Sequence, residues 1–314
     1  MTILVTGATG LIGSALVKSL AVRNGANIIA AVRNIEAAQA MFADMSNVQV
    51  INWDVSRGLA YSGEIDTIVH AAAPTSSRDF VEHPVEVIDA IVDGTRNVLE
   101  AARRKSVKSM VFLSTMEVYG SPSVDNVTEC DYGYLDPVSV RSSYPEAKRL
   151  AESMCVAYAK ECGVPVKIAR LTQTFGAGVK RGDARVFAQF GEAVASRRDI
   201  ILHTTGRTAR CYCSLRDAVT AIEAILDKGI AGEAYNVANP DTYCTIAEMA
   251  HNLARRHPGS SVCFETDEAQ NRGYAPEFRM KLDVTKLKDL GWAPTQGLDE
   301  MFDEMIARWE IDNG

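Results

Sequence analysis

Tyr144 and Lys148 are the residues whose types and spacing best support a chemical reaction. They begin and end the segment Tyr144-Pro-Glu-Ala-Lys148, so a helix would bring both side chains to one face. A free tyrosine, with a pKa of about 10, is mostly protonated at neutral pH, and a nearby ammonium lowers that pKa. The phenolate can take the proton of a substrate hydroxyl, as removal of a hydride from an alcohol carbon requires. Alone the pattern is weak, because such pairs are usually surface residues.

Residues 2–17 predict a phosphate-binding turn. The run Ile3-Leu-Val5 is typical of a buried strand, and Gly7, Gly10 and Gly13 follow it at once. Gly7 permits a tight turn, Gly10 lets a pyrophosphate approach bare backbone, and Gly13 lets a helix lie close to the sheet. The N–H groups at the start of that helix attract phosphate. Apolar residues at helical spacing then mark the helix: Leu11, Ile12, Ala15, Leu16 and Leu20.

A third segment, Ser114-Thr-Met-Glu-Val-Tyr-Gly120, follows an apolar strand. The T-G-x-x-G-x-x-G turn, this S-[ST]-x-x-V-Y-G segment and Y-x-x-x-K together resemble the extended short-chain dehydrogenase/reductases, the nucleotide-sugar epimerases and dehydratases. The resemblance covers essentially the whole chain. It implies that Tyr144 is the acid/base, that Lys148 tunes it and binds the nicotinamide ribose, and that Thr115 orients the substrate oxygen. The alternative for Thr115 is a strand-end cap.

Positions 116 and 117 separate the candidate reactions. The family's sugar 4,6-dehydratases have Thr-Asp-Glu where this chain has Thr115-Met-Glu117, and methionine cannot donate a proton. The UDP-glucuronate decarboxylases have Thr-Ser-Glu and an R-x-x-Y-x-x-x-K-R-x-A-E segment similar to residues 141–152, whereas simple 4-epimerases need neither carboxylate. Glu117 is therefore either functional or a structural carboxylate at the strand end.

Our leading hypothesis from the sequence is an NAD(P)-dependent nucleotide-sugar epimerase that transiently oxidises the sugar 4-hydroxyl. Decarboxylation ranks second and dehydration third. An NADP-dependent carbonyl reductase is a rival on the same fold. A non-catalytic dinucleotide sensor ranks last, because a sensor does not need Thr115, Tyr144 and Lys148.

The residues at the end of the second predicted strand indicate which cofactor, NAD or NADP, the chain prefers. NAD-preferring relatives have an acid there that accepts bonds from the ribose hydroxyls, but this chain has Val32 followed by Arg33. A planar guanidinium suits a 2′-phosphate, so we favour NADP over NAD. The alternative is a surface arginine. The resemblance further implies that Asp54 and Val55 contact the adenosine, and that a loop with Ala71 and Ala72 lines the cofactor.

The same resemblance places four residues at the substrate. Gln173 stands where the family's R-x-x-N-x-x-G segment has a substrate-contacting asparagine, and Thr75 follows the fourth predicted strand. Arg210 and Arg272 fall where the family clamps the nucleotide diphosphate, a task that suits a bidentate guanidinium. Either arginine is alternatively a solvated surface charge.

Strand and helix signals alternate through the first half of the chain. This alternation predicts an α/β fold, a doubly wound parallel sheet of the Rossmann type, which would bring these residues together. Residues 1–173 are predicted to form the dinucleotide-binding domain. Residues 174–314, with short strands between glycine turns, are predicted to form a smaller α+β substrate lobe, with some segments crossing back to the first domain. Further strands are predicted at 27–32, 48–53, 65–70, 109–113 and 166–171, and helices at 84–105 and 147–162.

The charge, hydropathy and cysteine content of the chain exclude some kinds of binding partner. The net charge of -7 argues against nucleic acid, and no apolar run approaches the roughly 20 residues of a membrane span. Seven cysteines without framework spacing suit a reducing cytoplasm, and a strand at residue 2 leaves no room for a signal peptide. Cys211-x-Cys213 has no second pair, so no metal site is predicted. From the resemblance we expect a homodimer formed by the helices at 84–105 and 147–162.

Overall fold

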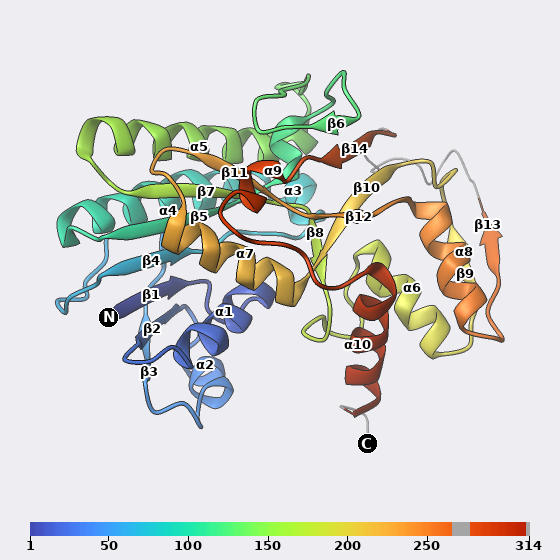
Figure 1. Ribbon diagram of the computed structural model, residues 1–314, viewed down its shortest axis with the longest axis horizontal. Coiled ribbons are helices and arrows are strands. Elements are labelled where there is room, and N and C mark those ends of the chain that lie inside the picture. Colours follow the sequence, from blue (N-terminus) through green and yellow to red (C-terminus); the bar gives the residue numbers. More distant parts are fainter. Residues whose placement is uncertain (266–276, 312–314) are drawn as a thin grey trace.

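The computed structural model describes residues 1–265 and 277–311, and its main body there is a parallel sheet between two helical layers (Figure 1). The sheet has seven strands in the order β11-β7-β5-β4-β1-β2-β3, all paired in parallel. The predicted doubly wound Rossmann fold is confirmed. The strand bounds are β1 Thr2–Thr6, β2 Asn27–Val32, β3 Val48–Asn52, β4 Thr67–His70, β5 Ser109–Thr115, β7 Val166–Leu171 and β11 Ala234–Val237.

Helices cover both faces of this sheet, which is why its central strands are apolar throughout rather than alternating. Figure 1 shows α4 (Pro84–Lys105) and α5 (Ser143–Cys162) together on one side and α1 (Leu11–Ala21) and α7 (Leu215–Lys228) on the other. A separate buried apolar cluster fills each interface. The short helices α2 (Ile35–Met41) and α3 (Asp79–Glu82) complete these layers.

The two long predicted helices differ in how well their bounds agree with the structure. Helix α4 has the predicted bounds, because Pro84 suits a first helical turn and Ser106 ends the helix in the left-handed conformation. Helix α5 begins at Ser143, four residues before the predicted start. Pro145 lies in its first turn, where a missing N–H costs nothing. Tyr144 therefore sits at the start of a helix whose next turn carries Lys148.

The second lobe is built on a smaller sheet, β12-β10-β14-β6, with β8 paired to β10. Its own apolar cluster is rich in aromatic rings, with Phe175 stacked on Phe187 at 4.4 Å. The strands are β6 Asn126–Val127, β8 Gln173–Phe175, β10 Ala209–Ser214, β12 Asn239–Thr245 and β14 Arg279–Leu282, with β9 Ile200–Leu202 and β13 Val262–Phe264 as a separate pair. The remaining helices are η1 Met116–Tyr119, η2 Val140–Ser142, α6 Val186–Ala195, α8 Ile246–Arg256, α9 Thr285–Lys288 and α10 Leu298–Ile311.

The chain crosses between the two parts more than a boundary at 173 implies. Strand β11, which the sequence placed in the small lobe, is the edge strand of the large sheet, where Tyr235 pairs with Ala169. Strand β6, from the first half, pairs with β14 of the small lobe. A four-residue apolar strand carries no local signal for the sheet it joins, because pairing is decided by long-range packing. Within the described residues, no helix has the length and apolar character of a membrane span.

Candidate active site

The glycine turn after β1 forms a cradle of bare backbone. Gly7 has a φ of +63°, and a Cβ there would lie 2.8 Å from the Ala72 backbone. A Cβ on Gly13 would lie 2.1 Å from the Gly7 carbonyl oxygen. Gly10 caps α1 without a side-chain hydrogen bond, which leaves the first N–H groups of the helix, including those of Leu11 and Ile12, to donate to an anion. This arrangement fits a dinucleotide pyrophosphate.

A buried histidine at the end of β4, for which the sequence predicted no role of its own, holds the loop that faces this cradle. His70 Nδ1 lies 2.8 Å from Thr6 Oγ1, and Ala72 N donates to the same Thr6 hydroxyl at 3.2 Å. Thr95 Oγ1 lies 3.4 Å from His70 Nε2. Burial, aided by the charge of Lys148, lowers the pKa of His70 to about 3, so the ring is neutral. The signal for it was a polar residue at the carboxyl end of a buried strand.

The adenosine-side residues lie just past β2 and β3. Asp54 Oδ1 accepts from the Ser56 N–H at 3.0 Å, and Ser56 holds the pKa of the Asp54 carboxyl below its usual value, with help from Arg33. Asn97 Nδ2 donates to the Val55 carbonyl at 2.9 Å and anchors this turn on α4. Arg33 is exposed. The sequence shows no acid beside Arg33, but the fold brings Asp54 within electrostatic range.

Tyr144 and Thr115 meet where β5 ends and α5 begins. The Tyr144 side chain is buried, and a hydrogen bond with Thr115 favours its ionised form. Burial, and secondarily the Glu117 charge, nevertheless raise the pKa of Tyr144. Thr115 Oγ1 also accepts from the Glu117 N–H at 3.2 Å, so the strand-end cap and the catalytic interpretation of Thr115 are compatible.

The Lys148 side chain is buried, unlike the lysine of an ordinary surface Tyr–Lys pair. Its Nζ donates to the Leu113 carbonyl at 2.7 Å and lies 4.6 Å from the centroid of the Phe112 ring. Burial lowers the pKa of Lys148 to about 8, against the opposing charge of Glu152. We expected this ammonium to lower the pKa of Tyr144. That role stays a prediction; in the structure the Arg141 charge also lowers the pKa of Tyr144, and the Lys148 ammonium bonds to a main-chain carbonyl.

Residues 116 and 117 point in different directions. Glu117 forms an ion pair with Arg141, with Nη2 to Oε2 at 2.9 Å, and each side chain is 29% exposed. Met116 is buried in the small lobe, where its Sδ accepts from Thr172 Oγ1 at 3.3 Å. Glu117 is therefore the acid of this segment whose charge acts on Tyr144, where it raises the phenol pKa after the larger effect of burial.

The predicted substrate residues are only partly brought together. Gln173 begins β8 and is in register with Tyr212, two residues along the neighbouring strand β10 from Arg210. The Arg210 guanidinium lies 4.7 Å from the centroid of the Phe278 ring, and its buried Nε has no hydrogen-bond partner among the described residues. An unpaired guanidinium nitrogen of this kind fits an anionic ligand. Thr75 is exposed, and Arg272 lies outside the described residues.

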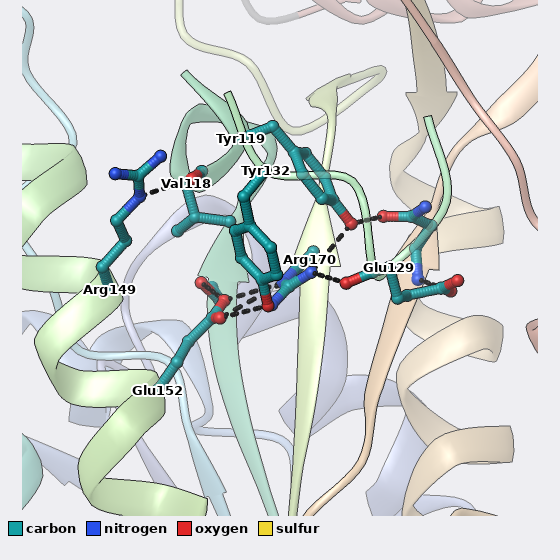
Figure 2. A network of polar contacts seen from close by, with 9 residues as sticks. Val118, Tyr119, Glu129, Tyr132, Arg149, Glu152 and Arg170 are labelled. Atoms are coloured by element: carbon teal, nitrogen blue, oxygen red, sulfur yellow. Dashed lines mark hydrogen bonds and ion pairs between the residues drawn. The ribbon is translucent and has the colours of Figure 1, made fainter. Parts of the chain in front are cut away.

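A buried network around Arg170 and Glu152 fixes α5, the helix that carries Tyr144 and Lys148 (Figure 2). Arg170 Nη2 donates to Glu152 Oε2 at 2.7 Å and to the Tyr132 hydroxyl at 2.6 Å, and Nη1 donates to the Tyr119 hydroxyl at 3.0 Å and to the Glu129 carbonyl at 2.8 Å. These contacts join α5, β7, η1 and the segment before η2. Removal of one partner from such a buried pair costs about 3–5 kcal/mol.

This fold and site define a Rossmann-type enzyme that uses a nicotinamide dinucleotide. The chain matches the NAD dependent epimerase/dehydratase family over residues 3–238 and belongs to that family. The resemblance inferred from the sequence motifs is thereby confirmed.

Curated relatives of this chain include decarboxylases. It is 31% identical to UDP-glucuronic acid decarboxylase 1 of Danio rerio over 312 residues, which is 97% of this chain and 71% of that protein. It is also 31% identical to UDP-glucuronic acid decarboxylase 6 of Arabidopsis thaliana over 304 residues, 96% of this chain and 86% of that one.

Solved structures share the fold at lower identity. The UDP-glucose 4-epimerase of Thermotoga maritima, solved with UDP-glucose, superposes with a TM-score of 0.86 at 23% identity, with 100% of both chains covered. DesIV, a dTDP-glucose 4,6-dehydratase from Streptomyces venezuelae solved with NAD bound, superposes with a TM-score of 0.84 at 24% identity and covers 100% of this chain and 98% of its own.

Proposed function

We propose that this chain is an NAD(P)-dependent decarboxylase of a nucleotide-activated uronic acid of the UDP-glucuronate type. The observation that carries the proposal is Glu117, whose main-chain N–H donates to the Thr115 hydroxyl, whose carboxylate pairs with Arg141, and whose charge acts on Tyr144. A simple 4-epimerase has no use for an acid there. The curated relatives support the same choice, so decarboxylation replaces epimerisation as our leading hypothesis.

The chain's own groups account for binding. The α1 N-terminus and the bare turn at Gly7 would hold the cofactor pyrophosphate, and Lys148 would bond its nicotinamide ribose. Arg210, with its unpartnered Nε, would bind the substrate diphosphate. Held there, the cofactor would supply a nicotinamide able to take up and return a hydride at the sugar C4. Arg33 favours NADP, whereas solved relatives such as DesIV carry NAD.

Tyr144 moves the proton in this scheme. Its oxygen takes the proton of the C4 hydroxyl, which Thr115 orients, and a 4-ketone results. The C6 carboxylate is then β to a ketone, so the C5–C6 bond breaks, carbon dioxide leaves, and the bonding electrons pass to the ketone oxygen. That oxygen accepts a hydrogen bond from the now protonated Tyr144. C5 takes up one proton from solvent, and we assign its delivery to the partly exposed Glu117.

Isotopic carbon dioxide tests the proposal directly. The chain is incubated with UDP-glucuronate labelled at C6, with NAD or NADP, and the released label is counted. We expect release that is lost in Tyr144→Phe, which removes only the proton-transferring oxygen. UDP-glucose serves as the control substrate without a carboxylate. Conversion of UDP-glucuronate to its 4-epimer without label release would refute decarboxylation and restore the epimerase hypothesis.

A homodimer is part of the proposal. The outer faces of α4 and α5 expose four large apolar side chains, Val85, Ile88, Leu150 and Val156. The two helices pack against each other on one side of the sheet, as Figure 1 shows. A second copy laid on this face would bury these side chains in a four-helix arrangement.

A further inference from the structure

Residues outside the predicted site converge on the Tyr144 ring. Phe80, from α3, stacks on it with ring centroids 4.1 Å apart and planes 7° from parallel. The guanidinium of Arg141, from η2, lies 5.1 Å from the centroid of the Phe80 ring. The same guanidinium donates to Glu117 Oε2 at 2.9 Å. Tyr144 is thus connected through one ring to one ion pair.

We propose that Arg141 is a positioning residue, which holds Glu117 by an ion pair and the Tyr144 ring through Phe80, and that the Glu117–Arg141 pair sets the electrostatic environment of the Tyr144 hydroxyl. The assignment rests on the proposed function only in that Tyr144 is its acid/base. It adds two residues, Arg141 and Phe80, to the machinery of the site.

The packing makes this arrangement rigid. Ser143 Oγ donates to the Phe80 carbonyl at 2.9 Å and so ties α3 to the first turn of α5. Phe80 is 2% exposed, which leaves its ring no room to swing away from Tyr144. Stacked aromatic pairs also attract each other beyond the area they bury. The position of the Tyr144 oxygen therefore depends on Phe80 and on what packs over Phe80.

The charges around Tyr144 can be assigned element by element. Glu117 on η1 raises the pKa of Tyr144, and Arg141 on η2 lowers it. Lys148, in the next turn of α5, gives its ammonium to the Leu113 carbonyl. Helix α3 contributes an uncharged ring. Loss of Arg141 would leave the Glu117 charge beside the phenol uncompensated, and loss of Glu117 would leave the arginine charge alone.

A fluorinated tyrosine at position 144 tests this without any substrate. 3,5-Difluorotyrosine is inserted there in the full chain, and its ¹⁹F shift is followed as a function of pH, because fluorine brings the phenol pKa into the range where the protein is folded. We expect Arg141→Gln to raise that pKa by about one pH unit and Glu117→Gln to lower it by a similar amount. The double variant should return close to the wild-type value.

Two further variants separate position from charge. Arg141→Lys keeps the positive charge, so it should restore most of the pKa that Arg141→Gln loses. Arg103→Gln removes an exposed arginine that pairs with Glu100 far from the site, and it should leave the titration unchanged. Single variants whose ¹⁹F titration coincides with that of the wild type would overturn the proposal. Failure to release carbon dioxide from any uronate would refute the proposed function alone.

Discussion

Lys148 should make the free energy of unfolding depend on pH in a way that a single substitution removes. Burial lowers its pKa from the ordinary 10.5 to about 8 in the folded chain. Between those two values the unfolded chain binds the proton that the folded chain has released. The contribution of Lys148 to the free energy of unfolding therefore rises with pH between those two values. Below pH 8 the folded chain is destabilised by the buried positive charge of Lys148.

The magnitude follows from the size of the lowering. About 2.5 pH units at about 1.4 kcal/mol each give a full effect of about 3 kcal/mol. Between pH 7 and pH 10, which is most of the window, wild type should gain about 2–3 kcal/mol relative to Lys148→Met. The variant also loses the bond to the Leu113 carbonyl, but that loss adds a nearly constant offset and leaves the slope unchanged.

Urea unfolding at pH 7, 8, 9 and 10 measures this difference. Lys18→Met, at an exposed position on α1, is the matched control and should follow the wild-type slope. Parallel curves for wild type and Lys148→Met would refute the reasoning, since they would mean that Lys148 titrates at the same pH in both states.

Three further predictions follow from individual contacts. Between pH 7 and pH 4 the wild type should lose about 3 kcal/mol more of its free energy of unfolding than His70→Gln does. The reason is that the pKa of the His70 ring is about 3 in the folded chain and 6.5 in the unfolded chain, so equal acid sensitivity of the two proteins in urea unfolding would contradict this. Arg33→Ala should weaken NADP by about 1–3 kcal/mol and barely change NAD, and equal losses in calorimetric titration would make Arg33 a bystander. Light scattering at micromolar concentration should find the wild type as a dimer. The double variant Ile88→Arg/Leu150→Arg should be a monomer, and a monomeric wild type would exclude the dimer.

The features that the sequence predicted well are local ones. The glycine turn and α4 are specified by neighbouring residues, because turn sterics and helix caps act over a few positions. The strand-helix alternation that sets the sheet is equally local. The role of Tyr144 and Lys148 as a pair stays a prediction, but their shared helix, which begins at Ser143, is seen in the structure.

The features that it did not predict depend on contacts between distant segments. Phe80 is a buried apolar residue in a short helix, and nothing near it in sequence indicates that it stacks on a tyrosine 64 positions later. The pairing of Arg141 with Glu117 spans 24 positions. The Lys148 ammonium on α5 bonds to the Leu113 carbonyl on β5, 35 positions earlier, and no local pattern indicates that bond. Such choices are made by tertiary packing.

Glu117 provides the prediction that separates the candidate reactions. A 4-epimerase moves one hydride off C4 and back while the ketone turns over, so it needs no base beside Tyr144. A decarboxylase must place a proton on C5 after carbon dioxide leaves. Glu117→Gln should therefore lower turnover by about 10²–10⁴-fold, the range for loss of a general acid or base. Under the epimerase hypothesis the loss should stay within about tenfold, or about 1.4 kcal/mol of barrier.

Heavy water gives the second readout for the same residue. In D₂O a decarboxylated product must carry one deuterium on C5, because the proton that replaces the carboxylate comes from solvent. Simple 4-epimerisation returns the same hydride and adds no deuterium to carbon. If Glu117 delivers that proton, Glu117→Gln should slow product formation without changing the deuterium content, since water can still reach C5. Mass spectra of a product free of carbon-bound deuterium would exclude decarboxylation, whatever the rate of the variant.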